Sequence, residues 1–205
     1  LIKNAKQEIT ASAKNFIIAT GSSSIEIPNI PVDEKQIVSS TGALSLTKVP
    51  KSLLVIGGGY IGLEMGSVWS RLGSKVTVVE ALDRIVPTMD GEIAKEFMKM
   101  LQKQGLEFKL SHKVSSAKSS KSGVDVEMET SNKKVIKENY EVVLMSVGRK
   151  PNTEGLGLEK IGVKLTDKKS IEIKDNFQTS VKGIFAIGDV APGPMLAHKA
   201  EEEGV

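Results

Sequence analysis

The apolar residues of this chain follow two different periods, and the changes of period predict its secondary structure. Residues 52–56 form a short apolar run typical of a buried strand, and helical spacing begins directly afterwards, over residues 60–72. A second apolar run at 75–80 predicts another strand. Residues 91–104 again have helical spacing, with Asp90 as an N-cap and Gly105 at the end, so they predict a second helix.

The pattern changes to strands after the second helix. We expect one strand near 106–110, and residues 124–128 then alternate in steps of two. A polar turn at 131–133 leads into another extended run, which indicates an antiparallel meander. Residues 142–145 are wholly apolar, as in a central strand that is buried on both faces. Together these elements predict an α/β fold, a Rossmann-like unit in which a parallel sheet carries helices and a β-meander.

The helical spacing also places the larger apolar side chains on one face of each helix. Each helix has one apolar stripe, and Gly73 suits the end of the first helix. The residues of these stripes are Ile61, Met65, Val68, Trp69 and Leu72 in the first helix, and Ile93, Phe97, Met100 and Leu101 in the second.

A glycine-rich motif joins the first strand to the first helix. It has the sequence Gly57-Gly58-Gly59-Tyr60-Ile61-Gly62-Leu63-Glu64, and Glu80 closes the following strand. A lone G-x-G-x-x-G is weak evidence for a binding site. When the motif lies between a strand and a helix, with an acid after the next strand, it predicts dinucleotide binding. We expect Gly57 to allow the turn, Gly59 to let a pyrophosphate approach the backbone, and Gly62 to bring the helix close to the sheet.

Glu80 predicts the choice of nucleotide. A carboxylate at this position accepts hydrogen bonds from the ribose hydroxyls and repels a 2′-phosphate, so NAD is favoured over NADP. Arg84 lies nearby, but the side chain at the end of the strand is the acid, so Arg84 does not reverse this prediction. The alternative is an ordinary glycine-rich turn beside a surface Glu.

Composition narrows the possible partners. The 205 residues suffice for one large domain or two small ones, and 40% of them are apolar, as in ordinary globular proteins. The net charge of +3 is too small to indicate nucleic acid or membrane, so we expect neither as a partner. The chain begins with Leu1 rather than Met and stops at Val205 just after a helix-like run, so we expect an internal part of a longer protein. The absence of Cys then says little about compartment.

Three apolar strands end in glycine. They lie at residues 16–22, 143–148 and 184–189, and we expect all three to be buried. In open α/β sheets ligands bind beyond the carboxyl ends of strands, so each glycine is a candidate for close approach to a ligand. Equally, each glycine can simply begin a loop.

These motifs, in this order, resemble the flavin-dependent pyridine-nucleotide disulfide oxidoreductases. The resemblance rests on residues 19–22, the 57–64 motif, residues 146–152 and residues 183–190, and it covers nearly the whole chain. Within that family, residues 80–87 and 193–200 look like the dihydrolipoamide dehydrogenases.

The resemblance implies a domain layout and a set of cofactor contacts. Residues 1–48 and 152–205 would be two parts of an FAD domain, and residues 49–151 an inserted NAD domain. Val114 and Gly148 would contact the two ends of NAD through their backbone. The residues expected near FAD are Thr20, Gly21, Ser22, Asp189, Met195, Leu196, Ala197 and His198.

Two further residues of the motif have alternative interpretations. Glu64 lies in the first turn of the helix, where the dipole alone favours an acid, whereas in the family the matching Glu pairs with a Lys beside the flavin. Tyr60 is either a packing residue or, as in several relatives, an aromatic that covers the flavin until nicotinamide displaces it.

The reaction implied by the resemblance is oxidation of dihydrolipoamide to lipoamide by NAD⁺ through FAD. The family's C-x-x-x-x-C pair is absent, since the chain has no Cys, and its His–Glu pair and first FAD glycine motif are not found here. We therefore expect no catalytic residue and no metal site in this chain, weak NAD(H) binding, no retained FAD and no turnover. The implied partners of the longer enzyme are lipoyl domains of 2-oxo-acid dehydrogenase complexes and a second copy in a homodimer, in bacterial cytoplasm or mitochondrial matrix. A non-catalytic NAD(H)-binding module and another flavin-dependent NADH oxidoreductase stay open as alternatives.

Overall fold

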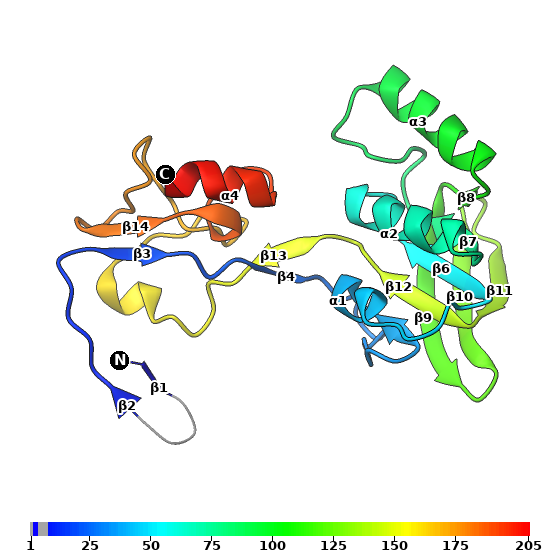
Figure 1. The fold of residues 1–205 in the computed structure, drawn as a ribbon, viewed down its shortest axis with the longest axis horizontal. Helices are drawn as coiled ribbons and strands as arrows, with labels where there is room; N and C mark the ends of the chain where they lie inside the picture. Colours follow the sequence, from blue (N-terminus) through cyan, green and yellow to red (C-terminus); the bar gives the residue numbers. More distant parts are fainter. Residues whose placement is uncertain (1, 4–7) are drawn as a thin grey trace. The chain divides into compact units, whose positions relative to one another are not determined.

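The computed structural model describes residues 2–3 and 8–205, which form two compact units (Figure 1). One unit comprises residues 24–148. The other combines the N-terminal residues up to Ser23 with residues 149–205. Each unit is described by itself below.

A five-stranded parallel sheet forms the centre of the 24–148 unit. Its strand order is β5 (Ile37–Val38), β12 (Val142–Met145), β6 (Ser52–Ile56), β7 (Lys75–Val79) and β8 (Glu107–Lys109). Every neighbouring pair in this order is parallel. The helices of the unit are α1 (Ser40–Leu44), α2 (Tyr60–Arg71) and α3 (Gly91–Lys103). The predicted parallel sheet is confirmed, and β12 is an interior strand as expected.

An antiparallel meander covers the face of this sheet opposite the helices (Figure 1). It consists of β9 (His112–Ser120), β10 (Gly123–Thr130) and β11 (Val135–Tyr140). The order is β11-β10-β9, with a register shift between Glu127 and Met128. The α/β fold with a packed meander, predicted from the periodicity, is therefore confirmed.

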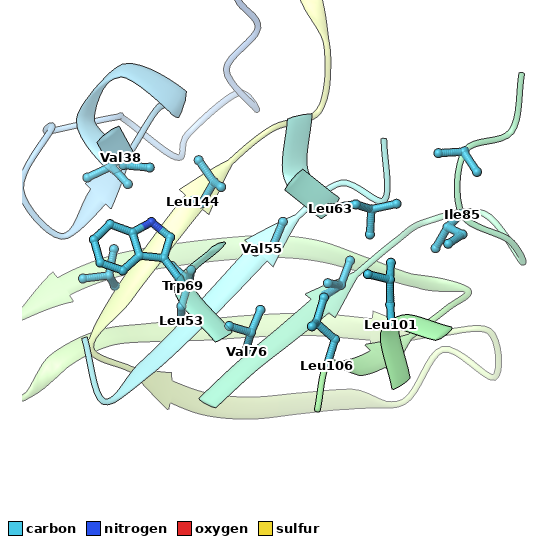
Figure 2. Packing of buried hydrophobic residues seen from close by; sticks show 14 of the residues in the cluster. Val38, Leu53, Val55, Leu63, Trp69, Val76, Ile85, Leu101, Leu106 and Leu144 are labelled. Carbon is cyan, nitrogen blue, oxygen red and sulfur yellow. The ribbon is translucent and has the colours of Figure 1, made fainter. Parts of the chain in front are cut away.

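The sheet is apolar along whole strands because both of its faces are covered. Leu53 and Val55 of β6 pack on the helical side, whereas Leu54 and Ile56 face the meander. Figure 2 shows the helical side, where Trp69 and Leu63 of α2 lie against the strands.

The apolar stripes of the two helices coincide only in part with their buried faces, since Trp69 and Leu101 are buried and other stripe residues are exposed. In α2 the buried residues are Gly62, Leu63, Gly66 and Trp69, while Val68 and Leu72 are exposed. In α3 only Ala94 and Leu101 are buried, and Ile93, Phe97 and Met100 are exposed. The physical reason is that α2 meets the sheet through its small residues, which let the two backbones approach. Its larger apolar side chains then lie beside α3, in an open groove lined by Met65, Val68, Phe97 and Met100.

The second unit contains short elements around a small core. Strands β3 (Phe16–Ile18) and β14 (Ile184–Ala186) pair in parallel, β4 (Ser22–Ser24) pairs with β13 (Arg149–Pro151), and β1 (Ile2–Lys3) pairs with β2 (Glu8–Ile9). The 3-10 helices are Leu158–Ile161 and Gly188–Val190, and α4 spans Ala197–Gly204. The core residues are Leu158, Val163, Ile171, Ala186 and Val190.

The expected burial of residues 16–22 is wrong. Phe16 and Ile17 are 49% and 66% exposed, because β3 belongs to a sheet of only two strands among the residues that the structure describes. In β14 only Ala186 is fully buried. Of the three glycine-terminated strands, the one ending at residue 148 is the strand buried on both faces.

Within the described ranges, no helix is both long enough and apolar enough to cross a membrane. The same residues contain no group of three or more His, Asp or Glu side chains arranged to hold a metal ion.

Asp33 links the loop before β5 to the meander. Its Oδ1 accepts hydrogen bonds from the backbone N–H groups of residues 35, 36 and 37 at 2.8, 2.8 and 2.9 Å, and its Oδ2 accepts one from Ser119 at 2.9 Å. Burial alone would raise the pKa of Asp33, but these hydrogen bonds outweigh it and hold the pKa below its usual value.

We expect Asp33→Asn to reduce the acid sensitivity of the 24–148 unit. A carboxyl with a lowered folded-state pKa stabilises the fold above its unfolded pKa, and this stabilisation is lost as the pH falls through the folded value. Urea unfolding at neutral pH and at about pH 3 should show a smaller loss of stability for the variant than for the unmodified chain. Equal losses would show that Asp33 contributes nothing to the acid response.

Candidate nucleotide-binding site

The turn from β6 into α2 depends on Gly57. This residue has φ of +109°, in the region that favours glycine, and its N–H donates to the carbonyl of Val79 at 2.9 Å. A Cβ at Gly57 would lie 2.5 Å from the carbonyl oxygen of Ser146. The turn role predicted for Gly57 is confirmed.

Gly62 holds α2 against the sheet. A Cβ there would meet the carbonyl oxygen of Gly57, and it would lie 2.6 Å from Oγ of Ser146 and 2.9 Å from Cγ1 of Val55. No side chain fits into that space without moving the backbone. The close packing predicted for Gly62 is therefore confirmed.

Gly59 borders open space. It is the N-cap of α2 and has extended backbone angles, with no side chain capping the helix. Apart from Gly59 itself and its two neighbours in the chain, no atom lies within 4 Å of the position that a Cβ would take. The start of the helix therefore presents backbone N–H groups and the positive end of the dipole beside free volume, an arrangement that suits an anion.

Glu80 lies directly after β7, beside the glycine turn. Its Oε2 accepts a hydrogen bond from the buried N–H of Gly58 at 2.7 Å, and its Oε1 accepts one from the N–H of Leu82 at 2.9 Å. The sequence pattern indicated a ribose contact for this carboxylate but not its hydrogen bond to the motif. In the structure, the parallel pairing of Ile56 with Val79 explains this bond, because it places the two following segments side by side.

Arg84 is directed to the loop that precedes α3. Its guanidinium donates to the carbonyl oxygen of Pro87 and lies 3.4 Å from that of Met89. These contacts agree with the interpretation that Arg84 does not determine the choice of nucleotide.

A pocket of about 270 Å³ opens beside the glycine turn. It brings together Gly57, Glu80 and Val114, which the sequence singled out, and Val147, which precedes Gly148. The lining residues that sequence reasoning missed are Ile27, Ile56, Val79, Ala81, His112 and Lys113. A volume below the roughly 300 Å³ of typical whole-ligand pockets fits one half of a dinucleotide.

The remaining residues of the motif divide between surface and core. Tyr60 is 45% exposed and Glu64 is exposed, so neither is a core packing residue. Ile61 is half-buried, and Leu63 is 1% exposed and packs in the core. Gly148 has φ of +133°, and its carbonyl accepts a hydrogen bond from Ile25.

The second unit gathers several of the residues expected near FAD. Oγ of Ser22 donates to Oδ2 of Asp189 at 2.5 Å, and Nε of Arg149 donates to Oγ of Ser22 at 2.6 Å. Oδ1 of Asp189 makes no hydrogen bond within the described ranges. One carboxylate oxygen is thus held by the protein while the other remains an available acceptor.

The loop around Asp189 is fixed by α4, and the segment near Thr20 is held by Asn152. Glu203 of α4 accepts a hydrogen bond from the N–H of Gly188 at 2.7 Å, and Lys199 donates to the carbonyl of Gly188 at 3.2 Å. Thr20 donates to the carbonyl of Asn152 at 2.7 Å, and the carbonyl of Gly21 accepts from the N–H of Asn152.

The segment before α4 lies at the surface. Met195 and Leu196 are half-buried, and Ala197 and His198 are exposed. The helix begins at Ala197, and no side chain caps it. Its first N–H groups therefore lie where a ligand can reach them.

Comparison with known proteins decides the family. The model of the pyridine nucleotide-disulphide oxidoreductases matches residues 1–204. The chain belongs to this family. The family uses FAD and NAD.

Curated relatives are similar over nearly the whole chain. A mitochondrial dihydrolipoyl dehydrogenase 1 from Arabidopsis thaliana is 58% identical over 94% of the chain and 38% of the relative. The mitochondrial dihydrolipoyl dehydrogenase of Pisum sativum is 54% identical over 97% of the chain and 40% of the relative. A leghemoglobin reductase of Vigna unguiculata is 56% identical over 94% of the chain and 37% of the relative. The chain therefore spans about 40% of the length of these relatives.

Solved structures of this family have the same fold. LpdA from Mycobacterium tuberculosis matches with a TM-score of 0.82 at 29% identity, over 92% of this chain and 40% of that one. A Cu(II) complex of the flavoprotein disulfide reductase RclA from Escherichia coli matches with a TM-score of 0.82 at 27% identity, over 92% of this chain and 43% of that one.

Proposed function

We propose that the 24–148 unit binds NAD(H), and that the whole chain is part of a dihydrolipoamide dehydrogenase. The observation that carries the first part is the combination of open space at Gly59 with the carboxylate of Glu80 beside the same turn. A calorimetric titration of the chain with NADH tests the proposed binding, and absence of binding would overturn the proposal.

The geometry supports a specific placement of the nucleotide. The diphosphate lies at the start of α2, where the N–H groups and the dipole stabilise its charge. A carboxylate has about four acceptor sites, and Glu80 uses two of them for Gly58 and Leu82, so two remain for the ribose hydroxyls. The adenosine end occupies the pocket beside Val114, and the nicotinamide end extends toward Gly148.

Glu80 both positions the turn and excludes a second phosphate. Its negative charge disfavours the 2′-phosphate of NADP, which carries close to two negative charges at neutral pH. NAD is therefore the preferred nucleotide.

The second unit supports an FAD site of the longer protein. The available Oδ1 of Asp189 suits a ribityl hydroxyl, and the uncapped start of α4 suits the electron-rich edge of a flavin ring. Thr20, Gly21, Ser22 and the 195–198 segment complete the proposed contacts. The proposed NAD domain, residues 49–151, lies between the 1–48 and 152–205 parts of the FAD domain, and the compact unit that contains its sheet also takes in residues 24–48. When bound, the flavin supplies the two-electron relay between a dithiol and NAD⁺.

The chain by itself lacks the groups for the complete reaction. It contains no Cys, so it offers no thiol to accept electrons from dihydrolipoamide. We propose that it binds NAD(H) weakly, does not retain FAD and turns over no substrate. A purified chain that shows a flavin absorption spectrum would contradict the second of these statements.

The relatives support the proposed setting. Lipoyl domains of 2-oxo-acid dehydrogenase complexes are the proposed partners of the longer enzyme, which forms a homodimer. The names of several relatives place them in mitochondria, and we propose the mitochondrial matrix or bacterial cytoplasm for this protein.

A second candidate function is that of another flavin-dependent NADH oxidoreductase. The 56% identity to a leghemoglobin reductase lies between the 54% and 58% identities to two dihydrolipoyl dehydrogenases, so identity alone does not separate the two. Assays of the longer protein with dihydrolipoamide and with a haem protein as alternative substrates distinguish them.

Replacing Glu80 tests the ribose contact. We expect Glu80→Ala to weaken NADH binding by roughly 1–3 kcal/mol, the usual cost of losing charge-assisted hydrogen bonds. Because Gly58 loses its partner too, the variant should also unfold at a lower urea concentration. Glu107→Ala removes an acid from the neighbouring strand and should leave NADH affinity unchanged. Wild-type affinity in Glu80→Ala would show that the ribose is bound elsewhere.

A further inference from the structure

Gly58, the central residue of the glycine turn, is held on both sides by the segment that follows β7. Its N–H donates to Oε2 of Glu80 at 2.7 Å, and its carbonyl accepts from the N–H of Val86 at 2.9 Å. Residues 80–87 therefore lie against the turn, and we call this segment the strap. The first bond comes from a residue assigned to the ribose, whereas the second comes from a residue with no assigned contact to the nucleotide.

The strap is strained at Val86. Its φ of +37° lies in the left-handed region, which side chains branched at Cβ rarely adopt. Pro87 follows, and a residue before proline ordinarily takes extended angles. Such strain persists only where the surrounding structure enforces it, and it is concentrated at functional sites. The strained residue of the strap is the one that donates to Gly58.

Packing and hydrogen bonding hold the strap in this conformation. The Ile85 side chain is 1% exposed and belongs to the core cluster that contains Leu63 (Figure 2). The carbonyl of Leu82 accepts a hydrogen bond from the N–H of Ser111 at 2.8 Å. A Cβ on Gly58 would lie 3.2 Å from Cγ2 of Ile85, so the strap packs closely against the turn.

The bond from Val86 determines where the next N–H of the turn points. The peptide bonds of the described residues are trans, and the C=O and N–H of a trans peptide point in opposite directions. Because the Gly58 carbonyl is directed to the strap, the Gly59 N–H of the same peptide is directed away from it. Gly59 is half-buried, and within the described residues its N–H makes no hydrogen bond. This N–H is therefore available to a ligand at the start of α2.

We propose that Val86 is a positioning residue for the diphosphate of the nucleotide. Its N–H holds the Gly58 carbonyl, and the peptide held in this way presents the Gly59 N–H to a diphosphate oxygen. This inference rests on the proposed binding of NAD(H) at the start of α2. Because the donor is oriented before the nucleotide arrives, binding does not need to order the turn.

The experiment removes this hydrogen bond and leaves the Val86 side chain in place. Cell-free translation with the α-hydroxy acid that corresponds to valine replaces the Val86 N–H by an ester oxygen. We expect the dissociation constant for NADH, measured by calorimetry, to rise roughly tenfold, the size of effect that follows the loss of a neutral hydrogen bond. An unchanged dissociation constant in a folded ester variant would overturn the role of Val86 and leave NAD(H) binding intact.

Met89 supplies the matched control, in the loop that continues from the strap. Its N–H donates to the carbonyl of Val86, also at 2.9 Å, but this bond does not reach the turn. An ester at Met89 should lower the midpoint of urea unfolding about as much as the ester at Val86, and change the NADH dissociation constant less than about twofold. Equal losses of affinity in the two ester variants would show that the bonds act only through the stability of the loop, and would refute the positioning role.

The NMR signal of the Gly59 amide separates positioning from stability. In a chain labelled with ¹⁵N-glycine, saturation with NAD⁺ should move this amide proton downfield, as a hydrogen bond to a diphosphate oxygen does. The shift should be smaller in the Val86 ester variant and of full size in the Met89 ester variant. A full-size shift in both variants would show that the Gly59 N–H is presented without Val86, contrary to the proposal.

Hydrogen exchange keeps the proposal testable if the Val86 ester variant does not fold. Linkage requires that a bond which aids binding is itself strengthened by the ligand. In the unmodified chain, saturating NAD⁺ should therefore slow exchange of the Val86 amide roughly tenfold more than exchange of the Met89 amide. Equal slowing of the two amides would overturn the role of Val86. If the unmodified chain binds no NADH at all, the proposed function fails, and this inference fails with it.

Discussion

Valine in place of Gly59 is expected to abolish NADH binding while leaving the fold in place. Gly59 has ordinary extended angles and no neighbour within 4 Å of a Cβ, so the protein itself accommodates the side chain. The valine methyl groups would occupy the volume assigned to the diphosphate, at the start of α2. We expect affinity to fall at least roughly a hundredfold, or about 2.8 kcal/mol.

The measurements are an NADH titration and a urea unfolding curve on the same sample. Since valine is a poorer N-cap than glycine, a loss of stability of about 1 kcal/mol is expected and does not affect the conclusion. Gly59→Ala is the graded control, with a smaller loss of affinity than valine causes. A folded Gly59→Val chain that binds NADH normally would place the diphosphate elsewhere.

Alanine in place of Gly62 is expected to destabilise the 24–148 unit by about 1–3 kcal/mol, the usual cost of overpacking. The added Cβ meets the carbonyl of Gly57, Oγ of Ser146 and Cγ1 of Val55 together. Two of these three are parts of the turn and the neighbouring strand end, so relief of the clash requires moving α2 away from the sheet. NADH affinity should fall as well, because the turn at Gly57 moves with the helix.

Gly66→Ala is the matched control, one turn further along the same helix. A Cβ at Gly66 would lie 3.4 to 3.6 Å from Val76, Leu106 and Val55, which is ordinary contact. Alanine is also the better helix former by about 1 kcal/mol, so this variant should be as stable as the unmodified chain or more so. Equal stabilities for the two variants in urea unfolding would contradict the account of how α2 packs.

The sequence predicted the elements of the 24–148 unit well because their local signals agree. The glycine turn, the cap at Asp90 and the alternation in β10 each act within a few residues, and each is found in the structure. The site residues that follow from the motif, Gly57 and Glu80, lie at one pocket for the same reason.

The side chains that face the core could not be read from helical spacing. Val68 and Phe97 belong to the apolar stripes of their helices but are exposed, and the contact of α2 with the sheet runs through Gly62 and Gly66. Only the three-dimensional fit of α2 against the sheet determines which of its side chains are buried. In the same way, β3 has the composition of a buried strand, and its exposure depends on how many strands are beside it.

Some of the pocket residues that were missed come from segments distant in sequence. His112 and Lys113 follow β8, so their meeting with Glu80 depends on strand order. No local pattern marks them. Once the parallel order of the sheet is known, the carboxyl ends of its strands identify this edge as the binding edge.

The most direct test of the central claim is to follow the backbone amides of a ¹⁵N-labelled chain by NMR as NAD⁺ is added. The account predicts that the largest shifts occur at residues 57–62, 80–82, 112–114 and 147–148, which surround the start of α2 and its pocket. A larger hollow of about 470 Å³ lies on the meander, lined by residues such as Lys118, Asp125 and Lys137. Shifts confined to that hollow, or no shifts at the glycine turn, would contradict the account.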